Sequence, residues 1–398
     1  MHKKIYIVGT GMDGALTLTR EGEEAIRNSD LLIGAERMLK PFESLEKPRL
    51  CEYRSEIIAD YIRKSEYEKF AVLMSGDCGF YSGAQKLLLL LNDMDTEVIC
   101  GISSPVYFCS KIKIPWQDMH FSSLHGRNAN AARLVSHYEK NFFLLGGNVT
   151  ISQLCQKLRD FGLENVTVYV GENLSTEKER IFSGNAKDFA SLQTEKLCVA
   201  VVINPQYEKS VRTGIDDSEF IRDKVPMTKS EVRCAVISKL EIGREDVCWD
   251  IGCGSGSVSV EMAMQCENGT VYAVDKNENA VRLTEQNSRR FACDNIKVIE
   301  SDASDADETL PAPDCVFVGG SGGELEKIIN SAYNKNNSVK LVVTAVSLET
   351  LTNCMTVFEK LGLTAEITQI SVTRTKKIGN HTMLSAENPV YIIKRIIK

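Results

Sequence analysis

The sequence is short of several features that mark specialised protein classes. Its thirteen cysteines contain no Cys-x-x-Cys pair, so we expect reduced, mostly buried thiols and neither a disulfide framework nor a metal site. The net charge of −7 lacks the basic excess that nucleic-acid binders usually show. Apolar runs such as Leu87–Leu91 are far shorter than a membrane span. These absences predict a globular protein with neither nucleic-acid nor membrane partners.

The first residues do not form a signal-peptide pattern. The apolar run after Lys3 and Lys4 covers only Ile5–Val8 before Gly9, and no small-residue cleavage site follows. A buried first strand explains this run better, so we expect a cytoplasmic protein. At 398 residues the chain is too long for one ordinary core, and two or three domains are predicted.

Two segments share the pattern of an apolar strand, a glycine-rich turn and a helix. The first is Ile5–Val8 followed by Gly9–Gly14, and the second is Val247–Ile251 followed by Gly252–Gly256. Each resembles the opening strand of a parallel α/β domain. The two halves show no sequence repeat, so a duplication is not indicated.

A change of composition between these segments predicts the domain boundary. The apolar run Val199–Ile203 ends at Asn204 and Pro205, and the residues that follow are polar. We therefore predict a first domain over residues 1–205, a connector with an N-terminal arm over 206–224, and a second domain over 225–398.

Apolar strands alternate with helical segments in both halves, which predicts crossover helices and mainly parallel sheets. The expected strands are Phe70–Met74, Glu97–Ile99, Phe142–Leu145, Val166–Val170, Val271–Val274, Lys297–Ile299, Cys315–Val318 and Leu341–Ala345. The tail differs, because Thr368–Arg374 and Val390–Ile397 resemble two strands without an intervening helix. They predict an antiparallel pair at the edge of the second sheet.

The glycine-rich turn of the second half predicts a cofactor site. Glycines alternate at 252, 254 and 256, where backbone must approach a ligand or adopt positive φ, and a helix then begins. The preceding Asp250 suits the amino group of S-adenosylmethionine better than the pyrophosphate of a dinucleotide. Cys253 and Ser255 complete the predicted cofactor loop.

Two later strand ends support this interpretation. Asp275 follows the next strand, where a carboxylate accepts hydrogen bonds from ribose hydroxyls. Asp302 follows the strand after that and is expected to receive the adenine amino group, with Ala303 against the ring. The three features in this order favour S-adenosylmethionine.

The second half resembles class I methyltransferases, and more specifically the decarboxylating precorrin methyltransferase family. The similar segments are Pro226–Arg233, Gly319–Gly323 and Glu387–Tyr391. The resemblance implies a Rossmann-like domain in which Thr228 closes over the cofactor. It also implies that the substrate lies at Gly319, Gly320, Ser321 and Gly322.

Glycine- and serine-rich loops follow successive strands of the first half as well. They are Ser75–Tyr81, Gly101–Pro105 and Leu124–Arg127, and they resemble the tetrapyrrole methylase family. The resemblance implies a two-lobed α/β domain, the class III methyltransferase fold, with cofactor in the cleft between its lobes. The cofactor residues expected there are Gly9, Gly11, Gly76, Asp77, Gly79, Ser103 and Ser104.

Two further residues of this half are candidates for catalysis or substrate contact. His125 is as often a structural hydrogen-bonding residue as a proton carrier, whereas Arg127 suits a substrate carboxylate. The family's loop prolines are replaced here by Met12-Asp13 and by Cys78, which loosens the turns without removing a reacting group.

Together the resemblances imply a cobalamin-biosynthesis enzyme that uses S-adenosylmethionine, one site per domain, on a corrinoid. The ring would be precorrin-6Y or its cobalt analogue, methylated at carbons 5 and 15 and decarboxylated at the acetate on carbon 12. A homo-oligomer is expected.

Arg374 belongs to the densest cationic group and is a substrate-binding candidate, although such a group is as often a solvated face.

Other functions remain open at this point. Both methyltransferase folds host enzymes that act on RNA or protein, although the acidic balance argues against RNA. A cofactor-binding regulatory module is disfavoured by two cofactor sites in one chain. An oxidoreductase is disfavoured because Gly-x-Gly-x-Gly departs from the dinucleotide spacing.

Overall fold

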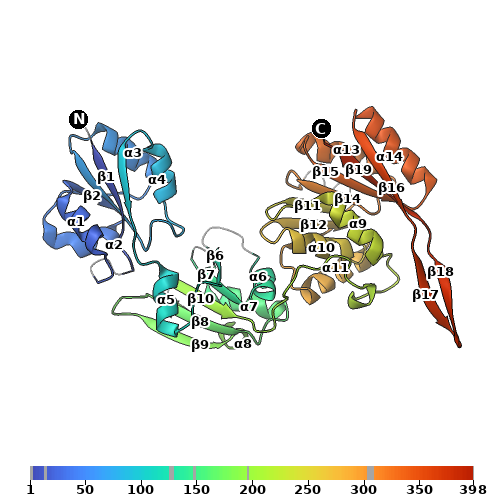
Figure 1. The fold of residues 1–398 in the computed structure, drawn as a ribbon, viewed down its shortest axis with the longest axis horizontal. Helices are drawn as coiled ribbons and strands as arrows, with labels where there is room; N and C mark the ends of the chain where they lie inside the picture. The colour runs from blue at the N-terminus through green and yellow to red at the C-terminus, as the bar shows by residue number, and fades with distance from the viewer. Residues whose placement is uncertain are drawn as a thin grey trace. The chain divides into compact units, whose positions relative to one another are not determined.

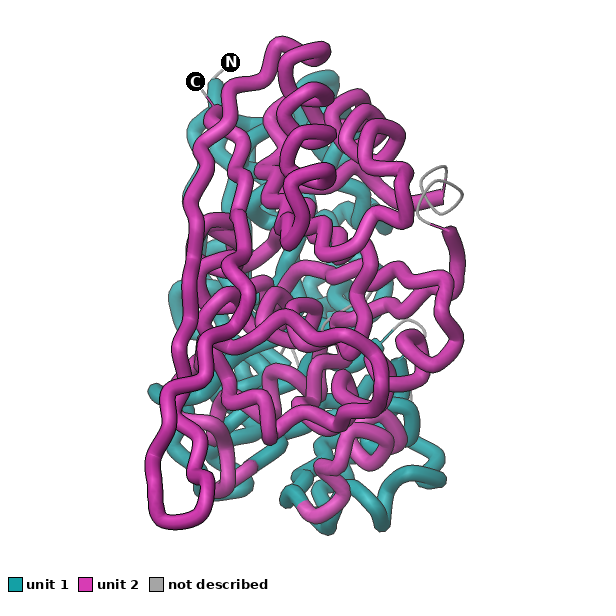
Figure 2. The backbone as a smooth tube through the Cα atoms, turned by 90° about the vertical axis from the view of Figure 1, so that its right-hand side faces the viewer, with its two compact units in different colours: residues 1–128, 140–155, 166–203 teal, residues 129–139, 156–165, 204–398 magenta. Residues whose placement is uncertain are grey.

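The structure, a computed structural model, describes residues 3–12, 16–124, 130–146, 149–194, 197–302 and 309–397. It contains two compact units (Figure 2). The first comprises residues 1–128, 140–155 and 166–203, and the second comprises 129–139, 156–165 and 204–398.

The first unit begins with a parallel sheet flanked by helices (Figure 1). Its strand order is β3-β2-β4-β1-β5, and its central strands are almost entirely buried, which explains their continuous apolar runs. The elements are β1 (Lys4–Gly9), α1 (Arg20–Asn28), β2 (Leu31–Gly34), α2 (Glu36–Leu39), the 3₁₀ helix η1 (Lys40–Leu45), β3 (Arg49–Cys51), α3 (Ser55–Lys64), β4 (Lys69–Met74), α4 (Ala84–Leu90) and β5 (Asp95–Ile99).

A second five-stranded sheet follows, in the order β6-β7-β10-β8-β9. The expectation of mainly parallel sheets is wrong here, because only β6 and β7 pair in parallel while β10 is antiparallel to both of its neighbours. The hairpin from β8 to β9 needs no crossover helix. The elements are α5 (Ser104–Ile112), β6 (His120–Ser123), α6 (Ala131–His137), β7 (Lys140–Leu144), α7 (Ile151–Asp160), β8 (Thr167–Glu172), β9 (Arg180–Asn185), α8 (Ala186–Phe189) and β10 (Cys198–Ile203).

The second unit contains a seven-stranded sheet in the order β13-β12-β11-β14-β15-β19-β16. Its elements are the 3₁₀ helix η2 (Asp217–Glu219), α9 (Ser230–Leu240), β11 (Val247–Ile251), α10 (Ser257–Gln265), β12 (Thr270–Asp275), α11 (Glu278–Arg290), β13 (Ile296–Glu300), β14 (Cys315–Val318), α13 (Leu325–Lys335), β15 (Lys340–Ala345), α14 (Leu348–Lys360), β16 (Thr364–Ile370), β17 (Thr373–Ile378), β18 (His381–Ala386) and β19 (Val390–Ile396).

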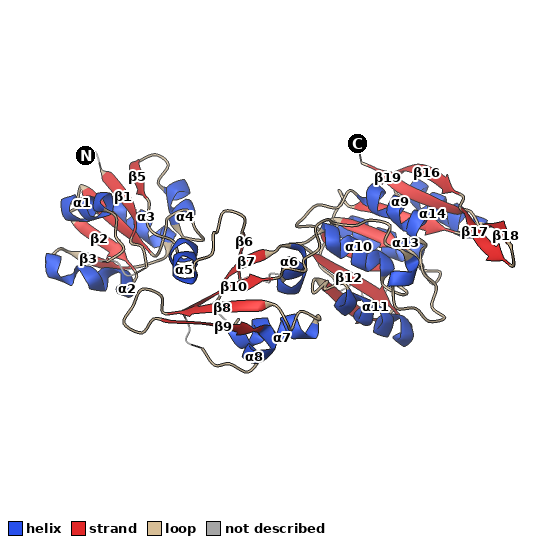
Figure 3. Ribbon diagram, turned by 60° about the horizontal axis from the view of Figure 1, so that its bottom comes forward, coloured by secondary structure: helices blue, strands red, loops and turns tan. Residues whose placement is uncertain are grey.

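Helices cover both faces of this sheet (Figure 3). One apolar cluster joins the sheet to α9 and α10 through residues such as Val236 and Val260. A second cluster joins it to α13 and α14 through residues such as Ile328 and Val357. The five strands β11 to β15 are parallel, as predicted for an α/β domain, so their loops end at one sheet edge.

The expected antiparallel pair at the edge of the second sheet is confirmed, because β16 and β19 pair antiparallel as the last two strands of that sheet. The first of them covers Thr364–Ile370 instead of Thr368–Arg374, and β19 is antiparallel to β15 as well. The hairpin β17–β18 was not predicted, and it extends beyond the sheet as a two-stranded ribbon (Figure 1). Neither face of this hairpin is buried, and Leu384 is largely exposed. Its sequence therefore lacks the sustained alternation of polar and apolar residues that predicts a half-buried strand.

Candidate functional sites

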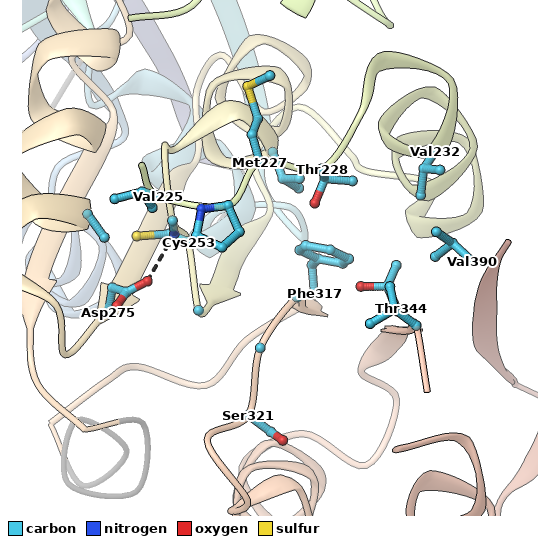
Figure 4. A pocket seen from close by; sticks show the side chains of 18 of the residues that line it. Val225, Met227, Thr228, Val232, Cys253, Asp275, Phe317, Ser321, Thr344 and Val390 are labelled. Carbon is cyan, nitrogen blue, oxygen red and sulfur yellow. Dashed lines mark hydrogen bonds between the residues drawn. The ribbon is translucent and has the colours of Figure 1, made fainter. Parts of the chain in front are cut away.

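The second unit has a cavity of about 540 Å³ at the carboxyl ends of its parallel strands, which we call the C-cavity (Figure 4). The glycine loop after β11, the segment 225–229, the loop 319–322 and the chain before β19 all line it. Predicted residues among its lining are Thr228, Gly252, Cys253, Gly254, Asp275, Asp302, Gly319, Gly320, Ser321 and Gly322. Segments far apart in the sequence therefore meet at one site, as the resemblance implied.

The loop after β11 requires its glycines. Gly252, Gly254 and Gly256 have φ angles of 74°, 57° and 74°. A Cβ at Gly252 would lie 2.4 Å from the Gly320 carbonyl oxygen, and one at Gly254 would lie 2.8 Å from the Pro226 carbonyl oxygen. The loop thus touches two other loops of the C-cavity through bare backbone.

Asp275 ends β12 with its carboxylate in the cavity lining. Oδ2 accepts a hydrogen bond from the Gly254 amide at 3.0 Å (Figure 4), and Oδ1 accepts one from the Asn277 amide at 3.0 Å. A carboxylate has about four acceptor positions, so lone pairs remain for a ligand. Two backbone donors therefore fix the orientation of this acceptor at the cavity, and its contact with ribose hydroxyls remains a prediction.

The rim of the C-cavity carries an ion pair. Lys276 Nζ lies 3.2 Å from Asp302 Oδ1, and both side chains are more than half exposed. An exposed pair of this kind contributes little to stability and opens readily to a ligand. Ala303, the predicted adenine contact, lies outside the described residues.

The segment 225–229 lies across the C-cavity. In Figure 4, Thr228 and Ser321 lie on opposite sides of Phe317. The Thr228 carbonyl accepts a hydrogen bond from Arg233 Nη1 at 2.6 Å, so α9 holds the segment in place. The sequence resemblance identified the segment, but nothing in the pattern indicated Arg233 as its anchor.

Three predicted cofactor residues lie beneath the C-cavity and do not line it. Asp250 is fully buried and accepts a short hydrogen bond from Ser259 Oγ, while its Oδ1 has no partner among the described residues. Ser255 is buried as well, and a Cβ at Gly256 would lie 2.8 Å from Thr284. Their direct contact with a cofactor remains a prediction.

Burial raises the pKa of Asp250 to about 7 from its ordinary value of 3.8. As pH rises from 4 to 7 the unfolded state loses this proton first, so stability falls by up to about 1.4 kcal/mol per pH unit through this group. Asp250→Asn is expected to remove that fall. Urea unfolding of both proteins between pH 4.5 and 7.5 checks it, and parallel curves would contradict it.

Arg374 does not line the C-cavity. Its guanidinium lies 2.5 Å from Glu231, 3.4 Å from Asp217 and 3.8 Å from Glu387. These carboxylates raise the pKa of Arg374, with Glu231 as the largest cause. Arg374, which the sequence predicts to bind substrate, is thus already paired with carboxylates of the protein. Its binding of substrate remains a prediction.

The first unit has a cavity of about 460 Å³, which we call the N-cavity. Loops that follow β1, β4 and β5 line it together with residues of the second sheet. The predicted cofactor residues Gly76, Asp77, Ser103 and Ser104 are among its lining. Gly9, Gly11 and Gly79 are not.

Close backbone contacts at Gly9 and Gly11 join the loops that follow β1, β4 and β5, although these two glycines do not line the N-cavity. Gly11 and Gly76 exchange two backbone hydrogen bonds of 3.0 and 2.8 Å, and both have positive φ. A Cβ at Gly9 would lie 2.7 Å from the Gly101 nitrogen. Asp77 accepts the Gly79 amide at 2.8 Å and the Gly101 amide at 3.0 Å, so it stabilises the same loops.

The two predicted catalytic residues of this unit, His125 and Arg127, lie outside the described residues. The replacement of a loop proline by Cys78 has a visible consequence, because this thiol is buried and burial raises its pKa to about 12. It is therefore an inert packing residue.

Sequence reasoning missed several residues that line the two cavities. Lys229 and Asn388 lie within the segments Pro226–Arg233 and Glu387–Tyr391 and Lys276 follows Asp275, so attention to every residue of these segments and to their neighbours would have found them. Arg37, Asn173 and Leu197 of the N-cavity belong to no motif. Only the fold brings these last residues to the site.

Among the described residues, no group of three or more histidine, cysteine or acidic side chains is placed to hold a metal. All thirteen cysteines are free. Within the same residues, no helix is both long and apolar enough to cross a membrane.

Comparison with known proteins identifies both units. The profile of the precorrin methyltransferase domain matches residues 218–396, and that of the tetrapyrrole (corrin/porphyrin) methylases matches residues 4–190. A probable cobalt-precorrin-6B C(15)-methyltransferase (decarboxylating) from Pyrobaculum calidifontis is 43% identical over 183 residues, 45% of this chain and 94% of that protein. The counterpart with the same name from Pyrobaculum aerophilum is 39% identical over 184 residues, 45% of this chain and 94% of that protein.

A solved structure is similar as well. The precorrin-6y C5,15-methyltransferase from Geobacter metallireducens is 38% identical, with 47% of this chain and 97% of that chain covered and a TM-score of 0.45. The expected family and fold class are confirmed by the matching profiles and curated relatives. The chain belongs to the precorrin methyltransferases, S-adenosylmethionine-dependent enzymes, and joins a tetrapyrrole methylase domain to a precorrin methyltransferase domain.

Proposed function

We propose that this chain methylates precorrin-6Y, or its cobalt analogue, at two ring carbons and removes one carboxyl group, in cobalamin biosynthesis. The first domain would methylate carbon 5. The second would methylate carbon 15 and decarboxylate the acetate on carbon 12. One observation carries the proposal for the second domain: the cofactor loop at Gly252 touches the substrate loop at Gly320 through bare backbone. The names of the curated relatives, which specify carbon 15 and decarboxylation, support it.

Each domain would bind one S-adenosylmethionine, and the described residues fit that cofactor. In the C-cavity, bare backbone at Gly252 and Gly254 leaves room for it and Asp275 offers an acceptor for the ribose. In the N-cavity, Gly76, Ser103 and Ser104 offer small side chains in a cavity of similar volume. When bound, the cofactor supplies a methyl group on an electrophilic sulfonium.

The protein would act mainly by positioning the acceptor carbon. Loops 252–254 and 319–322 would hold the two reactants on facing sides of the C-cavity, and such orientation supplies effective molarities of about 10⁵–10⁸ M at best. In the decarboxylation the bond from the acetate methylene to its carboxyl carbon breaks and carbon dioxide leaves. The electron pair enters the conjugated ring, and the methylene carbon then gains a proton.

Three further parts of the proposal concern organisation. The domains would comprise residues 1–205 and 225–398, joined by 206–224, in line with the break of the compact units near 203. A cytoplasmic location is supported by the burial of most cysteines as free thiols. A homo-oligomer is supported by exposed apolar side chains on the hairpin β17–β18, namely Ile378, Met383 and Leu384.

Mass spectrometry of the ring after incubation with S-adenosylmethionine tests the proposal. We expect the product to gain two methyl groups and to lose carbon dioxide, with either precorrin-6Y or its cobalt analogue. A gain of one methyl group without loss of carbon dioxide would show that the second domain does not act as proposed. An unchanged ring, in a protein that binds the cofactor, would overturn the corrinoid assignment and favour another methyl acceptor.

A further inference from the structure

Arg37 lies beside the N-cavity on the short helix that follows β2. Its neighbour Met38 also lines the cavity, and Thr10 Oγ1 lies 3.4 Å from Met38 Sδ. Thr10 directly follows β1, so α2 lies at the carboxyl end of this sheet. Ligands of open α/β sheets bind at this edge.

Among the described residues, no acidic side chain pairs with Arg37. Its side chain is exposed and has no hydrogen bond or ion pair among the described residues. The other charged side chain in the described lining of the N-cavity is Asp77. Asp77 accepts the backbone amides of Gly79 and Gly101, and among the described residues no ion pair joins it to Arg37.

A second acidic residue in the neighbourhood of Arg37 is also engaged. Glu52 shares with Arg37 the lining of a smaller adjoining cavity of about 160 Å³. It pairs in bidentate fashion with Arg54, at 3.0 and 2.7 Å, and accepts the amide of Tyr53 as well. Arg37 therefore stands at the junction of two cavities with a guanidinium that no carboxylate of the described chain neutralises.

We propose that Arg37 binds a carboxylate side chain of the ring substrate during the carbon-5 methylation by the first domain. This rests on the proposed function, since a corrinoid precursor carries several carboxylates. A guanidinium pairs with a carboxylate through two parallel hydrogen bonds, which fixes orientation as well as charge. The substrate's carboxylate is favoured over the cofactor's because the loops expected to hold the cofactor are buried at Thr10, Ser103 and Ser104, whereas Arg37 is at the exposed rim.

The test compares Arg37→Gln and Arg37→Lys with Lys40→Gln as the matched control. Lys40 is an exposed cation three residues further on that does not line the N-cavity. A cofactor with a ¹³C-labelled methyl group separates the two methylations by their NMR signals. Binding of S-adenosylmethionine is measured directly by calorimetry, and each variant's thermal unfolding is recorded.

We expect Arg37→Gln to raise KM for the carbon-5 methylation by about 10- to 100-fold with little change in kcat. Arg37→Lys should recover part of the loss, because it restores the charge without the planar fork. Lys40→Gln should match the wild type, and cofactor affinity should be unchanged in all variants. A ring analogue with its carboxylates amidated should lose little affinity on Arg37→Gln.

An unchanged KM in Arg37→Gln would overturn the inference, as would an equal loss with the amidated ring. A cofactor affinity that weakens by the same factor would assign Arg37 to the cofactor's carboxylate instead. If the wild type transfers no methyl group to the ring, the proposed function fails and this inference fails with it. If the wild type is active and Arg37→Gln equals it, only the inference fails.

Discussion

Asp275→Ala is expected to weaken cofactor binding at the C-cavity by about 100-fold or more and to silence the second domain. The substitution removes the acceptor proposed for the ribose hydroxyls, and each hydrogen bond to a charged group contributes about 1.5–3 kcal/mol. It also removes the partner of the Gly254 and Asn277 amides that orders the glycine loop. Mass spectrometry should show a ring with one added methyl group and no loss of carbon dioxide.

Glu300→Gln is the matched control for that variant. Glu300 ends β13 directly beside Asp275 in the parallel register, is exposed and does not line the C-cavity. It should keep both methylations and the decarboxylation. A doubly methylated, decarboxylated product from Asp275→Ala at wild-type rate would contradict the assignment of Asp275 as a cofactor residue.

Arg233→Met is expected to lower the free energy of unfolding of the second unit by about 3–5 kcal/mol, the usual effect of breaking a buried ion pair from one side. Arg233 and Glu261 are both fully buried and lie 2.5 Å apart. Glu261 also accepts the amides of Gly214 and Ile215, at 2.8 and 3.0 Å. Its carboxylate therefore cannot reach solvent without breaking these two hydrogen bonds to the segment 206–224. Denaturant unfolding measures the loss.

The same variant should also weaken cofactor binding at the C-cavity, because Arg233 holds the Thr228 carbonyl. Lys239→Met is the matched control on the same helix, since its partner Glu366 is about half exposed to solvent, in contrast to the buried Glu261. We expect it to change stability by less than about 1 kcal/mol. A double variant, Arg233→Met with Glu261→Leu, should recover part of the lost stability. Equal stability of Arg233→Met and wild type would contradict this account.

Much of the fold was predictable because its signals are local. The expected strands around Phe70, Val271 and Cys315 are confirmed, since parallel strands covered on both faces must be continuously apolar. The turn formed by the alternating glycines at 252, 254 and 256 was equally predictable from sequence, because positive φ angles and close backbone contacts exclude other residue types there.

Other features had no local signal. Strand β10 is as continuously apolar as a buried parallel strand, yet it pairs antiparallel with β7 and β8, because strand direction depends on the connection and not on composition. The hairpin β17–β18 is largely exposed, so its sequence has no regular alternation of apolar and polar residues from which a strand could be predicted. The burial of the Asp250 side chain against Ser259 also had no local signal, and contact of Asp250 with a cofactor remains a prediction.

The sequence by itself therefore determined the two domain types, the order of their loops along the chain and the position of Asp275, because strand apolarity and glycine spacing are properties of neighbouring residues. Only the tertiary structure decided which charges are engaged. Arg374 is surrounded by three carboxylates from other segments, while Arg37 at the N-cavity pairs with none in the part of the chain that the structure describes. That difference depends on residues far apart in the chain, since the interaction of two charges depends on their distance in space. The spacing of residues along the sequence therefore does not predict it.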